Sequence, residues 1–463
     1  MPSDNRNDIP DASLQPTMER RGFLKAVSAA AGIATLLGPD ALRGVKAAVD
    51  NVAGLAPVQA AQEEALWNEV QQGFTMSRSL INMDNGFTCP TPRVVTEAVK
   101  RYIDAQEEVP YGQWSQEARP RVATVREGLA NLFGCSTDEI AITRNATEAL
   151  RTVIYGFALK PGDEILTSSQ DYDSMLATLD HREQRDGITV VKARVPTPPK
   201  TMDELVGIFE RAITPKTRLI LVSHITYTTG QIFPVKQICD LAHSHGIDVL
   251  VDGAHSFAHL DFKLADLGCD YFGTSLHKWL LAPKGTGMLY IRKDKIASIP
   301  PIMGPPPRNG ADRMRKYESV GIQSTAPNLA IGEALAFHNA IGSKLKEERL
   351  RYLKNTWAGR LQALPKVRLY TPLAPEMSCG LAAIGIEGVE PTGLRNYLWE
   401  QHRIQTSRGY YEQGGALQWI RVSANLYTTM NELDKFCGVL EEVAKNGIPE
   451  PYKSFKPDPR FIR

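Results

Sequence analysis

The chain has 463 residues, of which 43% are hydrophobic and 23% are charged. Its 53 Lys and Arg residues nearly balance its 52 Asp and Glu residues, so no net charge would recruit nucleic acid or an anionic membrane surface. This length and composition favour an enzyme with one large and one smaller lobe that acts on small molecules. The six cysteines form no CxxC pair or His–Cys cluster, so we expect no metal site, and whether they form disulfides stays open.

The N-terminal residues are typical of an export signal. Arg20 and Arg21 precede a weakly hydrophobic run at residues 26–38, which is too short to span a bilayer. Paired arginines before such a run resemble a twin-arginine (Tat) signal, although the basic start of an amphipathic helix would look similar. Because residues 58–60 offer a cleavage site, we expect residues 1–60 to be a disordered lead plus a signal peptide read by the Tat translocon, and the mature protein to be periplasmic.

Short apolar runs alternate with helix-length segments such as residues 202–212 and 235–245. This alternation predicts a mainly parallel sheet with helices on both faces, which binds its ligand at the carboxyl ends of the strands. The predicted strands are residues 140–143, 164–168, 190–193, 219–223, 248–252, 271–274 and 287–291.

A Pro-, Arg- and Gly-rich loop at residues 300–313 ends this alternation. A long helical stretch at residues 326–364 follows and predicts a connector to a C-terminal α+β lobe. We therefore expect a large domain at residues 61–335 and a small domain at residues 336–463. We expect the first segment of the large domain, residues 61–110, to pack on the small domain.

Polar residues that suit a phosphate follow two of the predicted strands. Ala146 and Thr147 open a helix, so their amides and the Thr147 hydroxyl can receive an anion at the helix N-terminus. An ordinary helix cap explains this motif equally well when it is considered alone. Ser275 and His277 offer a hydroxyl and an imidazole to the same phosphate.

Two charged residues at neighbouring strand ends carry more chemistry. Asp252 directly follows a buried apolar run, and a buried carboxylate needs a partner. That partner is a salt-bridging side chain, a metal or the protonated nitrogen of a cofactor ring. Lys278 lies just past the next strand, where a buried amine has a lowered pKa and becomes a nucleophile toward aldehydes. Together with the phosphate-binding groups, this pair favours a cofactor with a ring nitrogen, an aldehyde and a phosphate.

The motifs VDGAHS at residues 251–256 and TSLHKW at residues 274–279 resemble the class V aminotransferase family of fold-type I enzymes. That family uses pyridoxal 5′-phosphate (PLP) and includes cysteine desulfurases, isopenicillin N epimerase-like proteins and kynureninase-like enzymes. The resemblance covers residues 82–442 and implies an α/β fold of type I. Its mainly parallel seven-stranded sheet would be sandwiched by helices, with a smaller C-terminal α+β domain, and the protein would be a homodimer.

The resemblance also implies roles for residues around the cofactor. Lys278 would be the catalytic lysine that forms the Schiff base, Asp252 the partner of the pyridine nitrogen, and His255 a neighbour of the ring face or its phenolic oxygen. Tyr172 takes the place of the aromatic residue that stacks on the ring. Tyr227 stands where desulfurases have an asparagine beside the cofactor oxygen. The phosphate would be held by Ala146, Thr147, Ser275 and His277.

The same resemblance gives a substrate residue and two further departures. Arg421 lies in a segment whose arginine would bind the α-carboxylate of the substrate, although a structural ion pair is the alternative. Residues 407–415 lack the reactive cysteine of the desulfurases, which makes desulfurase chemistry unfavourable. Ile322 replaces a threonine that reaches the phosphate of the partner subunit, which weakens the dimer prediction slightly.

The leading hypothesis is a periplasmic aminotransferase-like enzyme of the isopenicillin N epimerase-like branch. It would act on an amino acid or on an amino-acid residue of a peptide, and it is similar to Tat-exported PLP enzymes that tailor peptide siderophores. An amino-acid epimerase is the runner-up, and a cofactor-free binding protein on the same fold is the alternative from another class. The segments at residues 111–114 and 410–415 would form the walls for a peptide or would be packing loops.

Overall fold

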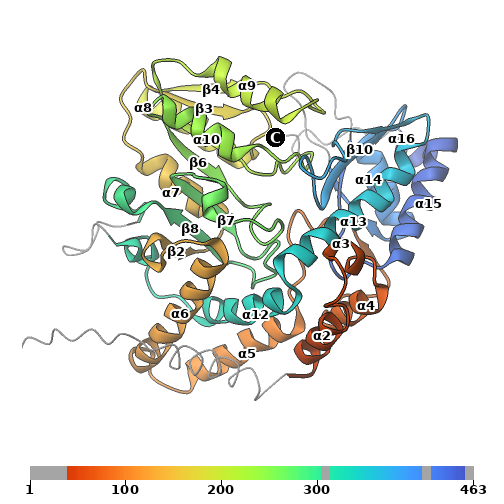
Figure 1. Ribbon diagram of the computed structural model, residues 1–463, viewed down its shortest axis with the longest axis horizontal. Helices are drawn as coiled ribbons and strands as arrows, with labels where there is room; N and C mark the ends of the chain where they lie inside the picture. Colours follow the sequence, from red (N-terminus) through yellow and green to blue (C-terminus); the bar gives the residue numbers. More distant parts are fainter. Residues whose placement is uncertain (1–38, 304–312, 409–418, 454–463) are drawn as a thin grey trace, which may run out of the picture. The chain divides into compact units, whose positions relative to one another are not determined.

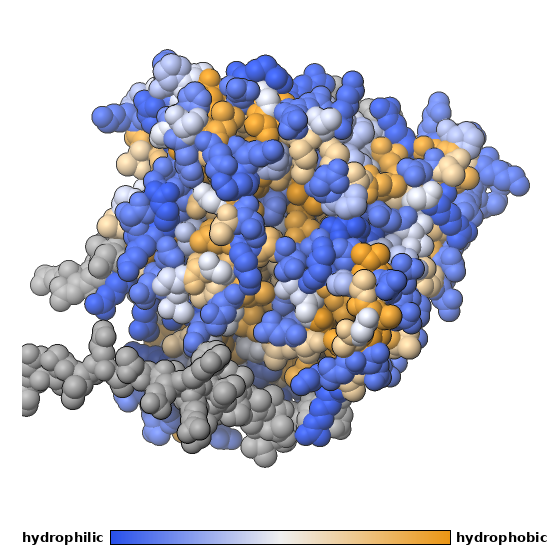
Figure 2. Space-filling model, in the orientation of Figure 1, coloured by the Kyte–Doolittle hydropathy of each residue, from blue (hydrophilic) through white to orange (hydrophobic). Residues whose placement is uncertain are grey.

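The computed structural model describes residues 39–303, 313–408 and 419–453. The chain divides after Asp40, and the second unit, residues 41–463, contains the fold described below. None of the helices in the described part is both long and apolar enough to cross a membrane. On the face shown in Figure 2, hydrophilic side chains cover most of the surface.

A seven-stranded sheet forms the centre of the large domain (Figure 1). Its strand order is β2-β8-β7-β6-β5-β3-β4, and β8 alone runs antiparallel to its neighbours. The predicted fold class is therefore confirmed. The strands are β2 (Ile140–Thr143), β3 (Glu164–Ser168), β4 (Thr189–Ala193), β5 (Thr217–Ser223), β6 (Asp248–Asp252), β7 (Tyr271–Ser275) and β8 (Gly287–Ile291).

Helices cover both faces of this sheet because successive strand side chains point in opposite directions. Val249 and Val251 of β6 pack with the helices of one face, whereas Leu250 packs with those of the other face. The first face is covered by α6 (Tyr111–Phe133), α9 (Met202–Ala212), α10 (Val235–Ser244) and α12 (Ile331–Ile341). The second face is covered by α7 (Ala146–Gly156) and α8 (Asp173–Asp186).

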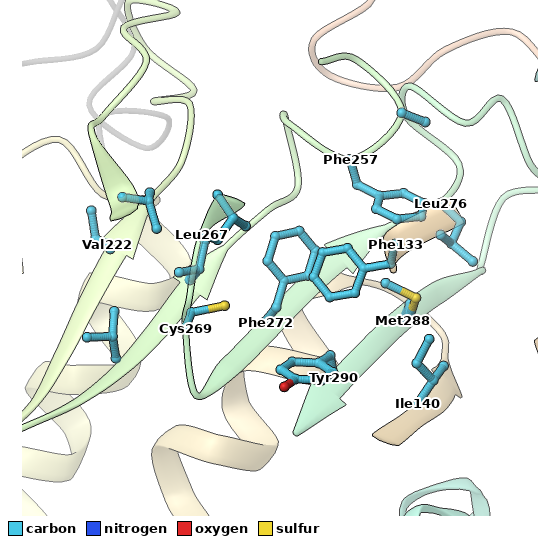
Figure 3. Packing of buried hydrophobic residues seen from close by; sticks show 14 of the residues in the cluster. Phe133, Ile140, Val222, Phe257, Leu267, Cys269, Phe272, Leu276, Met288 and Tyr290 are labelled. Carbon is cyan, nitrogen blue, oxygen red and sulfur yellow. The ribbon is translucent and has the colours of Figure 1, made fainter. Parts of the chain in front are cut away.

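An aromatic cluster on the first face fixes the end of β6. Figure 3 shows the rings of Phe133 and Phe272 next to each other, with centroids 4.6 Å apart. A Cβ atom on Gly253 would lie 1.8 Å from Cζ of Phe272, so no larger residue fits there. Because Gly253 follows Asp252, this close packing sets the position of the carboxylate.

The small domain is built on a four-stranded sheet of order β12-β13-β10-β9. The N-terminal segment contributes to the small domain through a separate two-stranded sheet, in which β1 (Ile81–Asn82) pairs in parallel with β11 (Ile404–Gln405). The other strands are β9 (Val367–Leu369), β10 (Leu381–Ile386), β12 (Ser407–Arg408) and β13 (Ile420–Ser423). The helices are α13 (Ser343–Gln362), α14 (Pro391–His402), α15 (Met430–Asn446) and α16 (Glu450–Lys453).

The single helix expected at residues 326–364 is interrupted. The structure has α11 (Ala326–Leu329), α12 and α13 in its place. Gly342 separates α12 from α13 with φ of +90°, a backbone conformation that favours glycine and ends a helix. The chain turns there, and α13 then runs toward the small domain (Figure 1).

Part of residues 1–60, the range expected to hold a disordered lead plus a signal peptide, is helical. Residues within that range form α2 (Pro39–Asn51) and α3 (Pro57–Ala60), followed by α4 (Glu64–Gln72) and later α5 (Arg93–Glu107). Val45 is fully buried in a cluster that includes Trp67 and Trp279. Cleavage near Ala61 would remove α2 and α3 and, with them, the buried side chain of Val45. The helix α2 is amphipathic and packs through Val45, but its Ala-rich sequence is also typical of a signal segment, so the sequence did not predict it.

Arg349 of α13 holds this segment in place. Its guanidinium is fully buried, lies 5.0 Å from the ring centroid of Trp67, and donates to the carbonyl of Ala61 at 3.0 Å. It also forms an ion pair with Glu64 at 2.6 Å. These contacts join α3, α4 and α13 through one charged group.

We expect Arg349→Ala to lower the free energy of unfolding by about 3 kcal/mol, because it leaves buried acceptors unpaired. The matched control is Arg360→Ala on the same helix, whose exposed pairs with Glu441 and Asp434 contribute about 1 kcal/mol or less. Urea unfolding of both variants measures the difference. Equal losses in the two variants would contradict the anchoring role of Arg349.

Candidate active site

A cavity of about 350 Å³ lies at the carboxyl ends of the strands, where parallel sheets bind ligands. Its walls come from the loops after β2, β3, β5, β6 and β7 and from β13 of the small domain. All ten of the residues predicted for the site line this one cavity. They are Ala146, Thr147, Tyr172, Tyr227, Asp252, His255, Ser275, His277, Lys278 and Arg421.

Lys278 lies in the turn after β7, and its Nζ is 3.1 Å from Nε2 of His255. Desolvation by the cavity walls lowers the pKa of Lys278 to about 8, and the positive charge of Arg421 acts in the same direction. The carboxylate of Asp252 opposes this shift. A minority of molecules, roughly a tenth at pH 7, therefore carry the uncharged amine that a nucleophile or base requires, far more than an ordinary lysine would.

Asp252 ends β6 and is almost fully buried. Its Oδ1 accepts one backbone hydrogen bond, from the amide of Ala254 at 2.9 Å. Burial raises the pKa of Asp252 to about 6. By contrast, the nearby buried carboxylate of Asp171 accepts hydrogen bonds from Thr167, Ser168 and Ser223. Asp252 is thus the less satisfied of the two buried carboxylates, and a cation in the cavity would stabilise its ionised form.

The predicted phosphate-binding residues meet at the N-terminus of α7. The cap of this helix is Asn145, whose side chain accepts from the amide of Glu148 at 2.9 Å, so the Thr147 hydroxyl is not used for capping. The amide of Ala146 donates to Oγ of Ser275 at 2.9 Å. His277 contacts the carbonyl of Thr286 through Nδ1 at 3.0 Å, which leaves Nε2 for another partner. Amides, hydroxyls and an imidazole around a helix N-terminus suit a phosphate.

Two tyrosines form an aromatic wall of the cavity. The rings of Tyr172 and Tyr227 are 5.1 Å apart and nearly perpendicular. Tyr172 keeps 40% of its surface exposed, as a ring that stacks on a ligand would, whereas Tyr227 is buried. Phe87 also lines the cavity and is 69% exposed. Sequence patterns gave no signal for Phe87.

Arg421 reaches the cavity from β13 and is only 2% exposed. It forms an ion pair with Asp84 at 2.9 Å and donates to the carbonyl of Tyr227 at 2.9 Å. Its Nε has no partner among the described residues. The structural ion pair that the sequence left as an alternative is therefore present, and the unused Nε is one donor available to a carboxylate. Asp84 was missed because it lies far from Arg421 in the sequence.

Of the two alternatives for residues 111–114, a peptide wall or a packing segment, the structure agrees with packing for Trp114. Trp114 is buried in its own hydrophobic cluster, and its indole donates to Oγ1 of Thr325 at 2.8 Å. Tyr111 lines a different cavity. Trp114 therefore stabilises α6 against α11. The second expected wall, at residues 410–415, lies outside the described residues.

No cysteine near the cavity is a reactive thiol. Cys89 is fully buried, accepts from Nδ2 of Asn425 at 3.1 Å, and has a pKa that burial raises to about 12. All six cysteines are unpaired. The thiol of Cys89 stays protonated and shielded, which does not suit it to accept sulfur.

The fold and this cavity define a fold-type I α/β enzyme whose donor set fits PLP. The amine of Lys278, with its lowered pKa, suits an aldehyde, the under-satisfied carboxylate of Asp252 suits a ring nitrogen, and the N-terminus of α7 suits a phosphate. The chain belongs to the class V aminotransferase family, whose model matches residues 81–436. The resemblance predicted from the two motifs is therefore confirmed.

Curated relatives include two isopenicillin N epimerases. That of Streptomyces clavuligerus is 30% identical over 391 residues, which cover 81% of this chain and 98% of that protein. That of Amycolatopsis lactamdurans is 31% identical over 398 residues, which cover 82% and 99%. A probable cysteine desulfurase of Methanothermobacter thermautotrophicus is 26% identical and covers 82% of this chain and 98% of that protein.

Solved structures share the fold. A C-DES mutant with glycine covalently linked to its PLP cofactor has a TM-score of 0.72 at 23% identity, covering 80% of this chain and 98% of that one. The cysteine desulfurase of Thermococcus onnurineus NA1 also has a TM-score of 0.72 at 23% identity, covering 81% and 98%.

We expect Asp252→Asn to stabilise the cofactor-free protein at pH 7. The folded pKa of about 6 exceeds the unfolded value of about 3.9, so stability falls as the pH rises through this interval, by about 3 kcal/mol in total. The variant lacks this loss, so the two proteins should converge below about pH 4. Thermal unfolding at pH 4 and pH 7 measures the effect.

The matched control is Asp171→Asn, which replaces an acceptor of several hydrogen bonds and should destabilise the protein at pH 7 by about 2 kcal/mol. If Asp252→Asn and Asp171→Asn destabilise alike at pH 7, Asp252 is already satisfied and needs no cation.

Proposed function

We propose that the protein is a PLP-dependent aminotransferase that acts on an amino acid or on an amino-acid residue of a peptide. The observation that carries this proposal is the position of a buried Lys278, whose pKa is lowered, in the same cavity as Asp252 and Arg421. These residues supply an amine for the aldehyde, a carboxylate for the ring nitrogen and a guanidinium for the substrate carboxylate.

Each residue group of the cavity would have a separate role in this reaction. Arg421 orients the substrate by binding its carboxylate, and the buried surroundings exclude water from it. Lys278 accepts the proton from Cα, because its pKa of about 8 leaves a useful fraction of free amine. PLP, when bound, supplies the electron sink that makes this proton acidic. Ala146, Thr147, Ser275 and His277 would hold its phosphate.

Epimerisation is the second candidate. The isopenicillin N epimerases match over nearly their whole length, which favours it. The two reactions share proton removal by Lys278 and differ in where the proton returns. An epimerase returns it to the opposite face of Cα, whereas an aminotransferase releases a keto product and transfers the amino group.

We expect Lys278→Ala to lose both covalent cofactor attachment and amino-acid turnover. Incubation with PLP, reduction with borohydride and peptide mass spectrometry should label Lys278 in the native protein. The control is Lys284→Gln, which changes the other lysine of the cavity, whose Nζ already donates to the carbonyl of Cys89 at 2.8 Å. A label on Lys284, or no label, would overturn the assignment.

The same preparations decide between the reactions. Amino-acid and short-peptide substrates in deuterated water should give keto product with the native protein and none with Lys278→Ala. Deuterium exchange at Cα with racemisation and without keto product would replace transamination by epimerisation.

We also propose that the protein is a homodimer exported to the periplasm through the Tat translocon. The support for export is the arginine pair before residues 26–38, since Tat carries folded proteins and would pass an enzyme that already holds its cofactor. The support for a dimer is the membership in this family, while Ile322, in place of the expected threonine, weakens it slightly.

We expect Arg20→Lys/Arg21→Lys to leave the precursor in the cytoplasm, because paired arginines define this signal. Fractionation followed by immunoblotting gives the distribution. The control is Arg6→Lys, an arginine outside the pair. Undiminished secretion of the double variant would contradict export by this route.

A further inference from the structure

A chain of directed hydrogen bonds lies behind Lys278 and connects it to the small domain. The indole Nε1 of Trp279 donates to Nδ1 of His255 at 3.4 Å, and Nε2 of His255 lies 3.1 Å from Nζ of Lys278. Behind them, His259 contacts the carbonyl of His255 through Nδ1 at 2.7 Å. His259 accepts the amide of Gly380 at Nε2 at 2.8 Å, just before β10 begins.

The hydrogen-bond donors of this network determine which ring nitrogen of each histidine carries the proton. An indole N–H can only donate, so Nδ1 of His255 is the acceptor and carries no proton. Burial lowers the pKa of His255 well below its usual value, so the ring is neutral and its single proton is on Nε2. That N–H faces Lys278, whose Nζ is then the acceptor. An ammonium group has no lone pair and cannot accept, so this arrangement matches an uncharged lysine.

Trp279 and His259 are themselves held in place. Their rings stack with centroids 3.8 Å apart and an angle of 24° between the planes. Both are buried, and burial lowers the pKa of His259 to about 3. Because Gly380 donates to Nε2 of His259, the proton of His259 is on Nδ1 and points to the carbonyl of His255. Lys346 donates to the carbonyl of Trp279.

We propose that Trp279 and His259 are positioning residues that hold His255 as its Nε2–H tautomer, with this N–H directed at Lys278. Without the indole donor, His255 can adopt the other tautomer and accept a hydrogen bond from a protonated lysine. The pair thereby keeps the amine of Lys278 free and nucleophilic. This inference rests on the proposed role of Lys278 as the amine that reacts with an aldehyde.

The charged and titratable groups around this hydrogen-bond network change the pKa values of Lys278 and His255, but the hydrogen bond from Trp279 favours the Nε2–H tautomer of His255. Asp252, Asp84 and Cys89 raise the pKa of Lys278, whereas Arg421 lowers it. Lys278, Arg421 and His259 each lower the pKa of His255. A protonated Lys278 would donate to Nε2 and favour the Nδ1–H form of His255, whereas the indole N–H of Trp279 favours the Nε2–H form.

The first test measures the tautomer in the cofactor-free protein. Nitrogen NMR of the imidazole rings should show His255 as the Nε2–H form, and Trp279→Phe should convert a measurable fraction to the Nδ1–H form. Phenylalanine keeps a ring to stack on His259 but lacks the N–H. The matched control is Trp357→Phe, because the buried indole N–H of Trp357 has no partner among the described residues. An unchanged tautomer in Trp279→Phe would overturn the proposal.

The second test measures how fast the cofactor-free protein captures the aldehyde of PLP as a function of pH. The midpoint for the native protein should lie near 8, and Trp279→Phe should raise it by about one pH unit, which lowers the rate at pH 7 about tenfold. His255→Gln supplies an amide N–H that does not depend on tautomerism, so adding it to Trp279→Phe should restore the midpoint.

The outcomes separate this proposal from the proposed function. A tautomer change without a shift of the capture midpoint overturns the effect on Lys278 and leaves its catalytic role intact. If no lysine captures the aldehyde in the native protein, the proposed function fails, whatever the tautomer of His255. Equal loss of capture in Trp279→Phe and Trp357→Phe, with no shift of midpoint in either, indicates damage to packing and also overturns the proposal.

Discussion

Burial of the carboxylate of Asp252 at the end of β6 is the constraint on which the site depends. The close contact between Gly253 and Phe272 holds this strand end against the aromatic core, so the carboxylate cannot move out toward water. The same desolvation raises the pKa of Asp252 to about 6 and lowers that of Lys278 to about 8. The cavity therefore holds a carboxylate that a cation would stabilise and an amine that can react with an electrophile. PLP has both a ring nitrogen that can be protonated and an aldehyde.

The substrate end of the cavity depends on segments far apart in the sequence. Arg421 comes from β13, whereas its ion-pair partner Asp84 follows β1. Pairing of β1 with β11, together with a bridge from Asp84 to Ser423, brings these two groups together. The N-terminal segment is thus part of the site, and its anchoring by Arg349 supports the substrate end as well as the stability of the fold.

The sequence predicted the large sheet and the cofactor end of the site because both have local patterns. Apolar runs marked the strands, and Asp252 and Lys278 stand directly after them, where α/β sheets place their ligands. The ion pair of Asp84 and the contact of Trp279 with His255 had no such pattern, since they depend on tertiary pairing. The sequence could not decide whether Trp114 forms a wall of the cavity or packs in the core, because an aromatic residue in a Gly-containing segment suits both equally well, and in the structure it packs in the core.

The pairing of Arg421 with Asp84 bears on which substrates the cavity accepts. In the proposed function, a substrate carboxylate at Arg421 would share the guanidinium with Asp84, so it would gain less than it would from an unpaired arginine. Other contacts must then contribute to binding, and the apolar surfaces of Phe87 and Tyr172 lie in the same cavity. A free amino acid with a small side chain offers little to these rings, whereas a peptide or a bulky amino acid covers them. The weak carboxylate site and the aromatic wall therefore both support the larger substrate class within the proposed function.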